Sequence, residues 1–304
     1  MSNNKNIVLT GATGFVGKNL ISSFNSTLFK ISPLKREALT GNLKLDIDTN
    51  IIIHLAGKAH DLKNVSNPNE YYQVNYELTK SLYDAFLNSN ATKFVFISSV
   101  KAAADHVDGI LTENIIPNPQ TFYGKSKLMA EQYIQSQPLS EGKSYYILRP
   151  CMVHGPGNKG NLNLLYQLVR KGVPYPLAGF HNKRSFLSME NLCFIIKELI
   201  TRDDIASGIY QVADDEPLST SEVVSILAAS LNKKPRLWNI SPRLITFFAR
   251  AGDALHLPLT TERLAKLTES YLVSNAKIKA AIGKPLPLDA KEGLAITASS
   301  FAMA

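Results

Sequence analysis

Apolar residues follow two different periodicities along the first part of the chain. Residues 6–9 form a short aliphatic run, which is typical of a buried strand. Residues 15–24 instead place apolar side chains at the spacing of a helix. Gly11 and Gly14 lie between the two segments, and Gly17 lies within the second. This pattern predicts a strand, a glycine turn and a helix.

The same alternation continues strictly to about residue 150, and the pattern becomes less regular beyond it. It predicts strands at 28–34, 42–45, 51–55, 93–97, 144–148 and 209–212, and helices at 70–88, 122–135, 161–171, 189–201 and 219–231. This order predicts an α/β fold of the Rossmann type, with a doubly wound, mostly parallel sheet. Few residues separate the runs at 42–45 and 51–55, whereas a parallel crossover takes roughly 10–12 or more. We therefore expect a trimmed third βα unit and an unusual sheet edge.

The glycine turn predicts a site for a dinucleotide. Gly11 allows a tight turn, Gly14 lets backbone N–H groups approach a pyrophosphate, and Gly17 lets the helix pack closely on the strand. The helix N-terminus adds partial positive charge. An ordinary βα turn is the alternative, but the flanking strand and helix favour the cofactor site. We expect cofactor contacts at Gly11, Thr13, Gly14, Phe15, Val16 and Gly17.

The segment after the second predicted strand bears on the choice of cofactor. At this place an acidic residue binds the ribose 2′-hydroxyl of NAD, and a basic one suits the 2′-phosphate of NADP. Lys35 and Arg36 precede Glu37, which favours NADP(H) within the broader prediction of NAD(P)(H). Solvated loop charges are the alternative. We expect Asp46 to lie near the adenine.

Beyond residue 150 the strict alternation ends, and from residue 237 short helices predominate. Residues 244–249 form the most apolar piece, a core helix or a surface that touches a membrane or partner, and we predict core. We expect residues 1–155, with returning segments near 185–213, to form the dinucleotide-binding domain. Residues 156–184 and 214–304 are expected to form a small, mixed substrate-binding region.

Composition narrows the class of protein. The 304 residues include two cysteines, and the formal charge is +8. Two cysteines give no disulfide framework, which favours a reducing cytoplasm. The basic residues are scattered, which fits an anionic substrate, a weak attraction to acidic membranes or a basic solvated surface better than nucleic acid. No apolar run is long enough to span a bilayer, and the polar start is not a signal peptide, so we expect no stable membrane insertion. We predict no metal site.

Three residues form a second chemical signal. Tyr123 and Lys127 lie four apart in a predicted helix, and therefore on one face. A phenol serves as a general acid or base when a nearby ammonium group lowers its pKa. Ser99 follows a predicted strand and would hold a substrate oxygen beside the phenol. A plain helix face is the alternative, but the glycine turn makes the catalytic interpretation more specific. For His54, a core position is favoured over chemistry.

These residues resemble the extended short-chain dehydrogenase/reductases that act on nucleotide sugars. The resemblance covers residues 7–293 and rests on TGATGFVG at 10–17, HLA at 54–56, VN at 74–75, ISS at 97–99, YGKSK at 123–127, RP at 149–150 and GPG at 155–157. It implies that Tyr123 exchanges a proton with the sugar while hydride moves to or from nicotinamide, and that Lys127 binds the nicotinamide ribose. It also implies a homodimer formed through residues 70–88 and 122–135. Further cofactor contacts are implied at Leu55, Ala56, Gly57, Asn75, Ser98, Tyr123, Lys127 and Pro150.

The resemblance also narrows the reaction. The family's 4,6-dehydratases carry an Asp-Glu pair after the catalytic Ser or Thr, whereas this chain has Val100 and Lys101, so we exclude a dehydratase. The closest likeness is to a UDP-glucose 4-epimerase-like subgroup that includes 4-ketoreductases forming UDP-N-acetylquinovosamine or UDP-N-acetylfucosamine. We expect such a reductase, acting in the synthesis of surface polysaccharides such as the lipopolysaccharide O-antigen. A UDP-hexose 4-epimerase is the first alternative, and His154, where the family has Tyr, weakens it. A non-enzymatic NADP-sensing protein is the second.

The substrate is expected to be a UDP-sugar. Asn161 and Arg184 match family positions that contact the nucleotide, and the planar fork of arginine suits a diphosphate. Lys101 occupies a position at which a dehydratase has an acidic residue, and its side chain either contacts the sugar or is solvated.

Overall fold

The computed structural model describes residues 4–24, 28–40, 43–58, 67–158, 160–255 and 259–302. Its centre is a six-stranded sheet in the order β2-β1-β3-β4-β6-β9, in which every neighbouring pair is parallel. The strands are β1 (Lys5–Thr10), β2 (Phe29–Leu34), β3 (Ile51–His54), β4 (Lys93–Ile97), β6 (Ser144–Pro150) and β9 (Gly208–Val212). The predicted Rossmann-type sheet is confirmed.

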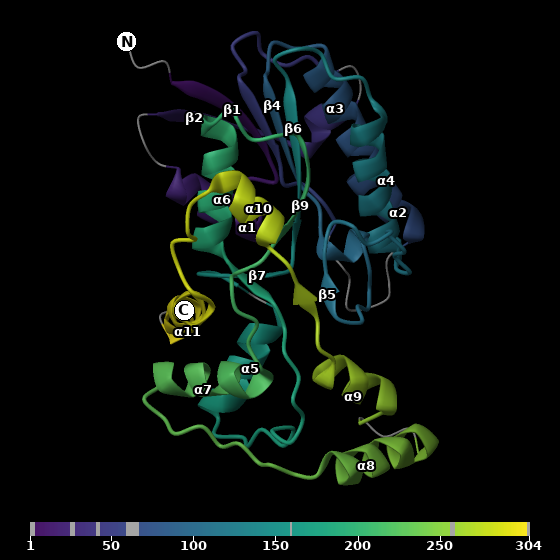
Figure 1. Cartoon of the computed structure of the whole chain (residues 1–304), viewed down its shortest axis with the longest axis vertical. Helices are drawn as coiled ribbons and strands as arrows, with labels where there is room; N and C mark the ends of the chain where they lie inside the picture. The colour runs from purple at the N-terminus through teal and green to yellow at the C-terminus, as the bar shows by residue number, and fades with distance from the viewer. Residues whose placement is uncertain are drawn as a thin grey trace.

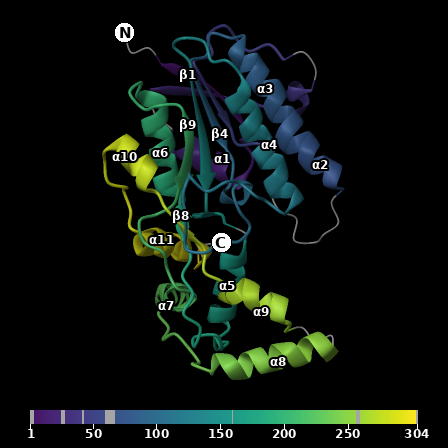
Figure 2. The same cartoon turned by 45° about the vertical axis from the view of Figure 1, so that its right-hand side comes forward.

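Helices cover both faces of this sheet (Figures 1 and 2). One face carries α1 (Phe15–Ser23), α6 (Met189–Thr201) and α10 (Ala276–Ile282). The other carries α2 (Pro68–Tyr72), α3 (Leu78–Leu87) and α4 (Phe122–Ser136). Two-sided covering explains why the central strands β3 and β4 are buried along their whole length rather than at alternate positions.

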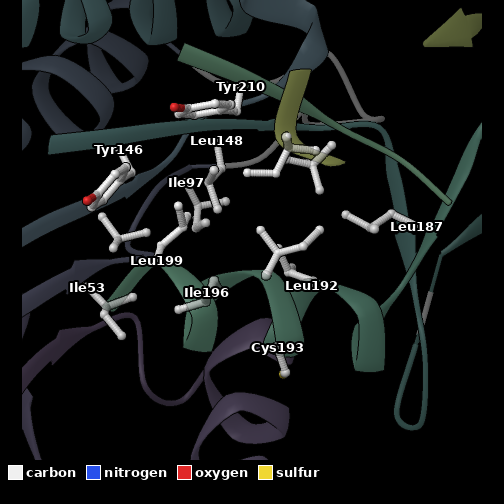
Figure 3. Close-up of a cluster of buried hydrophobic side chains, with 14 of the residues drawn as sticks. Ile53, Ile97, Tyr146, Leu148, Leu187, Leu192, Cys193, Ile196, Leu199 and Tyr210 are labelled. Atoms are coloured by element: carbon white, nitrogen blue, oxygen red, sulfur yellow. The ribbon is translucent and has the colours of Figure 1, made fainter. Parts of the chain in front are cut away.

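The larger core lies between the sheet and α6 (Figure 3). Leu148 from the sheet faces Leu192 and Ile196 from the helix, and each of these side chains is fully buried. Burial of one such aliphatic side chain contributes about 1.5–3 kcal/mol. This packing holds the carboxyl ends of the central strands in fixed positions.

The helix predicted at 70–88 is present but interrupted. A π-helical turn, Gln73–Glu77, joins α2 to α3 and contains the buried Asn75. Such turns are rare and often occur at functional sites.

The third βα unit is trimmed, as predicted. After β2 the chain makes only a 3-10 turn, Arg36–Leu39, and β2 remains the edge of the sheet in the part of the chain described. The strand predicted at 42–45 is wrong for residues 43–45, which have no regular structure, and Asn42 lies outside the described residues. The reason is the short path back to β3, where the Asn50 N–H already binds the Asn6 carbonyl at the amino end of β1.

The remaining elements form a smaller region below the carboxyl ends of the strands (Figure 1). Two parallel strand pairs link it to the sheet region, β7 (Met152–His154) with β8 (Phe186–Ser188) and β5 (Ile110–Leu111) with β10 (Leu272–Val273). Its helices are α5 (Asn161–Arg170), α7 (Thr220–Ser230), α8 (Pro242–Leu255), α9 (Thr261–Thr268) and α11 (Ala290–Ala302). Helix α7 begins with a capping box between Ser219 and Glu222.

The prediction that residues 244–249 belong to the core is wrong for most of their large side chains. Ile245 and Ala249 are buried, but Leu244, Phe247 and Phe248 are 49%, 66% and 55% exposed. Helix α8 lies at the far end of the molecule, with protein on its inner side only (Figures 1 and 2).

Candidate active site

The glycine turn has the geometry that a dinucleotide requires. Gly11 has a φ of +70°, and a Cβ there would lie 2.8 Å from the Ala56 nitrogen. A Cβ at Gly17 would lie 2.3 Å from the Gly11 carbonyl oxygen, so α1 packs directly on the turn. Gly14 is the N-cap of α1 and provides no side-chain cap. No capping side chain therefore covers the start of α1, so this glycine cradle lets backbone N–H groups approach a pyrophosphate.

The segment after β3 extends this cradle. The Ala56 N–H donates to the Thr10 hydroxyl, which joins the ends of β3 and β1. A Cβ at Gly57 would lie 3.0 Å from Lys127 Nζ and 3.1 Å from Asn75 Oδ1. Glycine at this position therefore leaves room for the lysine beneath the strand end.

Asn75, Ser98 and Pro150 were predicted to contact the cofactor, but their side chains are buried. Asn75 Nδ2 donates to the Lys58 carbonyl and to Ser126, and its Oδ1 accepts from the Lys58 N–H. The Ser98 hydroxyl donates to the Glu131 carboxylate. The Asn75 side chain thus holds the backbone at Lys58 in place and Ser98 supports Glu131, and contact of Asn75, Ser98 and Pro150 with the cofactor stays a prediction.

The two predicted adenosine-side contacts have different outcomes. Lys35 and Arg36 are exposed just past the carboxyl end of β2, beside the β1 end that leads into Gly11. Asp46 lies at the opposite end of the sheet, because its carbonyl accepts from Thr49 and the neighbouring Asp48 carbonyl accepts from Asn6 at the start of β1. The expectation that Asp46 lies near adenine is therefore wrong. Because the third crossover is missing, the segment that contains Asp46 returns directly to the amino-terminal end of the strands.

Two histidines, one in and one beside the motifs shared with the family, have structural roles. His54 is fully buried between the hydroxyls of Thr10 and Thr79, at 2.6 and 2.8 Å. Burial, with a smaller effect of the Lys127 charge, lowers the pKa of His54 to about 3. The predicted core position is confirmed. His154 is also fully buried and bonds to Thr297 at 2.8 Å.

Tyr123 lies in the first turn of α4, which Thr121 caps by accepting from the Gly124 N–H. A Cβ at Gly124 would lie 2.3 Å from the Lys101 carbonyl oxygen, so glycine allows α4 to pack closely on the turn after β4. This contact brings Tyr123 within hydrogen-bonding reach of Ser99. The Ser99 hydroxyl also accepts from the Lys101 N–H.

The acid–base chemistry of Tyr123 differs from the sequence expectation. Burial raises the pKa of the Tyr123 phenol, and the hydrogen bond with Ser99 opposes this. The predicted lowering by Lys127 is not seen here, and the Lys127 ammonium instead donates to the Ile97 carbonyl at 2.9 Å. Burial lowers the pKa of Lys127 to about 8, and Glu131 opposes this shift. In this state Tyr123 is a neutral phenol suited to donate a proton.

Sequence reasoning missed the residues that support this pair. Glu131 lies one helical turn after Lys127 and is fully buried. It accepts from Arg149 Nε at 3.0 and 3.1 Å and from Ser98. Arg149 on β6 is almost completely buried as well. A charged residue at i+8 from Tyr123 was the available signal, since the i, i+4, i+8 series shares one helix face.

A cavity of about 620 Å³ opens beside Tyr123. All three predicted substrate residues, Lys101, Asn161 and Arg184, line it together with Tyr123. Lys101 is not simply solvated, because its Nζ donates to the Asp105 carbonyl at 2.7 Å and lies 4.5 Å from the centre of the Tyr271 ring. Burial lowers the pKa of Lys101, and Asp105 and Glu269 oppose this. The cavity thus joins a proton donor to three cationic side chains, Lys101, Arg184 and Lys266, and it is also lined by the acidic residues Asp105 and Glu269.

The other side of the cavity comes from a part of the chain in which sequence reasoning found no site. Lys266 on α9, Glu269 and Tyr271 line it. Arg184 donates to the carbonyls of Lys266 and of Glu269, the latter at 3.0 Å. The Tyr271 hydroxyl donates to the Ala104 carbonyl at 2.7 Å. No local motif marks these residues, because tertiary contacts alone bring them to the cavity.

The described residues contain no group of three or more His, Cys, Asp or Glu side chains arranged to hold a metal ion. Within the same ranges, no helix has the length and apolarity needed to cross a bilayer.

The parallel sheet, the glycine cradle and the Ser–Tyr–Lys group define a Rossmann-type enzyme site, and comparisons with known proteins agree. Residues 7–213 match the NAD dependent epimerase/dehydratase family. The chain is 30% identical to a UDP-glucose 4-epimerase of Vibrio cholerae over 99% of this chain and 96% of that protein. The chain therefore belongs to the NAD dependent epimerase/dehydratase family, and the predicted NAD(P)-dependent enzyme class is confirmed.

Two further relatives illustrate the range of the family. A UDP-2-acetamido-2,6-beta-L-arabino-hexul-4-ose reductase of Pseudomonas aeruginosa is 31% identical over 52% of this chain and 38% of its own length. The structure of RMD from Pseudomonas aeruginosa complexed with NADPH superposes with a TM-score of 0.75 at 20% identity, covering 99% of this chain and 100% of that one. The likeness of fold therefore extends over the whole chain.

Proposed function

We propose that this enzyme reduces the 4-keto group of a UDP-activated, 4-keto-6-deoxy N-acetylhexosamine. The observation that carries the proposal is the shared cavity, where the Tyr123 phenol faces the same space as Lys101 and Arg184. A nucleotide sugar has the matching shape, with a diphosphate at one end and a reactive sugar carbon at the other. The Pseudomonas aeruginosa relative named as a hexulose reductase supports the same substrate class.

Each residue of the site has a separate role in the proposed reaction. Tyr123 donates its phenolic proton to the sugar O4 while C4 receives a hydride, so that the ketone becomes an alcohol. Ser99 holds the same oxygen by a hydrogen bond. Lys127 holds the nicotinamide ribose and keeps positive charge near the phenolate that remains. Arg184, Asn161 and Lys101 bind the nucleotide diphosphate and the sugar.

The same site disfavours elimination of water. Val100, where a dehydratase keeps its acid, is buried and has no titratable group. Lys101, the next residue, is a cation whose side chain is already bonded to the Asp105 carbonyl. A UDP-hexose 4-epimerase is the second candidate, and the Vibrio cholerae relative favours it. An epimerase retains its cofactor and reoxidises it in each cycle, which separates the two candidates by experiment.

The cofactor is proposed to be NADP(H), which supplies the hydride when bound. The glycine cradle fits the pyrophosphate, and the exposed Lys35 and Arg36 at the end of β2 suit a 2′-phosphate. The cofactor contacts proposed in the cradle are Gly11, Thr13, Gly14, Phe15, Val16, Gly17, Leu55, Ala56 and Gly57.

We also propose that cofactor and substrate bind to different regions of the chain. Residues 1–155, with the segments near 185–213, bind the cofactor, and residues 156–184 and 214–304 bind the substrate. We place the enzyme in the cytoplasm, in surface-polysaccharide synthesis, and the two buried, unpaired cysteines agree with a reducing compartment.

A homodimer through α2, α3 and α4 is also proposed. The exposed Phe122 and Met129 on α4 support it, and Met129→Glu is expected to give a monomer in analytical ultracentrifugation.

The test is the loss of reduced-nicotinamide absorbance when protein, NADPH and UDP-2-acetamido-2,6-dideoxy-4-hexulose are mixed. We expect stoichiometric oxidation, with Tyr123→Phe lowering kcat by about 10²–10⁴-fold. Tyr145→Phe, on the amino-terminal half of β6, is the matched control and should react normally. Retained NAD with interconversion of UDP-GlcNAc and UDP-GalNAc would instead identify an epimerase. Inactivity in both assays would leave the NADP-sensing alternative.

A further inference from the structure

Helix α8 has three different faces. Ile245, Ala249 and Gly252, spaced four and three apart, are buried against the protein. Leu244, Phe248 and Leu255 form a second stripe with the same kind of spacing, and their side chains are 49%, 55% and 68% exposed. Phe247 joins this stripe, is 66% exposed, and packs its ring 5.8 Å from that of Phe248. An exposed stripe of four large apolar side chains is unusual for a helix that faces water alone.

Basic residues border this apolar stripe. Arg243 and Arg250 lie seven residues apart, hence on one edge of α8, and both are exposed. The sequence around α8, residues 233–269, contains seven basic and three acidic residues; of the basic ones, Lys266 lines the cavity, and Lys233 and Arg236 donate to carbonyls at the end of α5. This excess of four positive charges is half of the formal charge of the whole chain. A helix with an apolar face and a basic flank has the properties of helices that lie in the interface of anionic bilayers.

Helix α8 is also connected to one wall of the active-site cavity. Asp253 on α8 accepts from the Thr261 N–H and hydroxyl at the start of α9, at 3.0 and 2.7 Å. The other end of α9 supplies Lys266, which lines the cavity and whose carbonyl accepts from Arg184. One helix thus separates the outer apolar stripe from the wall of the cavity.

We propose that the outer face of α8, formed by Leu244, Phe247, Phe248 and Leu255, docks on the surface of an anionic phospholipid bilayer. The apolar side chains enter the acyl boundary while Arg243 and Arg250 meet the lipid phosphates. The active-site cavity is then held next to the membrane without insertion of any spanning segment. The proposal goes beyond the catalytic function and does not depend on which sugar is reduced.

A second copy of the chain fits this face less well. A stable dimer takes roughly 800 Å² and 20–30 residues from each partner, whereas this stripe offers four large side chains on one helix. Self-pairing would also bring two positively charged segments together, at an electrostatic cost. Anionic lipid compensates the same charge.

The experiment is co-sedimentation of the full chain with sucrose-loaded vesicles, either of pure phosphatidylcholine or of equal parts phosphatidylcholine and phosphatidylglycerol. We expect binding to the anionic vesicles that weakens as salt rises, because screening shortens from about 10 Å at 0.1 M to about 3 Å at 1 M. Phe247→Ser/Phe248→Ser should lower the partition coefficient at least tenfold, since it removes most of the apolar area. Arg243→Gln/Arg250→Gln should lower it on anionic vesicles only.

A matched control replaces two exposed apolar residues elsewhere. Ile47→Ser/Ile116→Ser changes side chains that are 73% and 87% exposed and should bind vesicles like the wild type. All variants should keep their NADPH affinity, which shows that they fold. Wild-type protein that stays in the supernatant, or Phe variants that sediment fully, would overturn the proposal. A wild-type oligomer that the Phe variants dissociate, without vesicle binding, would overturn it in favour of a second copy.

Discussion

The two walls of the proposed active site, one for the cofactor and one for the substrate, are built in contrasting ways. The cofactor wall comes from short, continuous segments at the carboxyl ends of neighbouring strands, and its key property is the absence of side chains at Gly11 and Gly17. The substrate wall combines Lys101, Arg184 and Lys266, which are far apart in the chain and which only the fold brings together. Backbone geometry thus constrains the first wall, whereas side-chain chemistry determines the second. Substitutions on one wall should therefore leave the other intact.

Gly17→Ala should give the largest effect, and only on the cofactor wall. The new Cβ would lie 2.3 Å from the Gly11 carbonyl oxygen and 2.7 Å from the Ala12 Cα. Both are backbone atoms, so α1 must move, at a cost of about 3 kcal/mol. Thermal denaturation and NADPH titration should show lower stability and at least a roughly tenfold weaker Kd, the loss of one well-placed hydrogen bond or more.

Gly283→Ala is the control for this change. Gly283 has a φ of +65° but no atom within 4 Å of an added Cβ, so only backbone strain of about 1–2 kcal/mol is expected. NADPH affinity should not change. If Gly17→Ala bound NADPH as the wild type does, the role of close α1 packing would be refuted.

Arg184→Ala should act on the substrate wall alone. Each lost charge-assisted hydrogen bond is worth about 1.5–3 kcal/mol, so the KM for the UDP-sugar should rise about tenfold to a hundredfold. The KM for NADPH should stay constant. Arg236→Ala, which removes an exposed arginine bonded to the Gly172 carbonyl, is the control and should leave both constants unchanged. Equal changes in both KM values would contradict the separation of the walls.

Lys35→Ser/Arg36→Ser should give a smaller effect, confined to the choice of cofactor. Loss of the basic pair should shift the ratio of kcat/KM for NADPH over NADH about tenfold toward NADH, the equivalent of one hydrogen bond. Lys44→Ser, beside Asp46 and away from the cradle, should leave the ratio unchanged. A ratio that the double variant does not alter would show that these side chains are solvated loop charges.

Lys127→Met removes a proposed catalytic residue and should abolish activity, but its effect on stability and on the pH dependence of stability should be the smallest of this series. Burial lowers the pKa of Lys127 from 10.5 to about 8. Below pH 8 both states are protonated and the burial penalty is complete. Between pH 8 and 10.5 the native amine loses its proton while the unfolded one keeps it, so the wild type gains stability with rising pH. The variant should therefore have the higher Tm at pH 7, by a few degrees, and the difference should shrink toward pH 10.

Lys125→Met, on the exposed side of the same helix, serves as the control and should show no such trend. A difference in Tm between Lys127→Met and wild type that does not vary with pH would contradict the assigned burial of this charge.

The contrast between the walls also explains what the sequence could predict. The strand, turn and helix around Gly14 are local, so their pattern predicted both the fold and the cradle. Asp46 was misplaced because the path of a trimmed unit depends on where the next strand begins. Residues 244–249 were misread because an apolar helical pattern does not reveal what covers it. Lys266 and Tyr271 lacked any local signal, since only tertiary contacts bring them to the cavity.

The most direct test of the central claim follows the hydride itself. NADPH deuterated at C4 of the nicotinamide, in either of its two stereochemical forms, is mixed with the enzyme and the UDP-4-keto-6-deoxy sugar, and the product is examined by NMR. We predict that one of the two forms places a single deuterium at the sugar C4 for each NADPH oxidised. A product without deuterium at C4, or epimerisation with no net NADPH consumption, would contradict the assignment of a 4-ketoreductase.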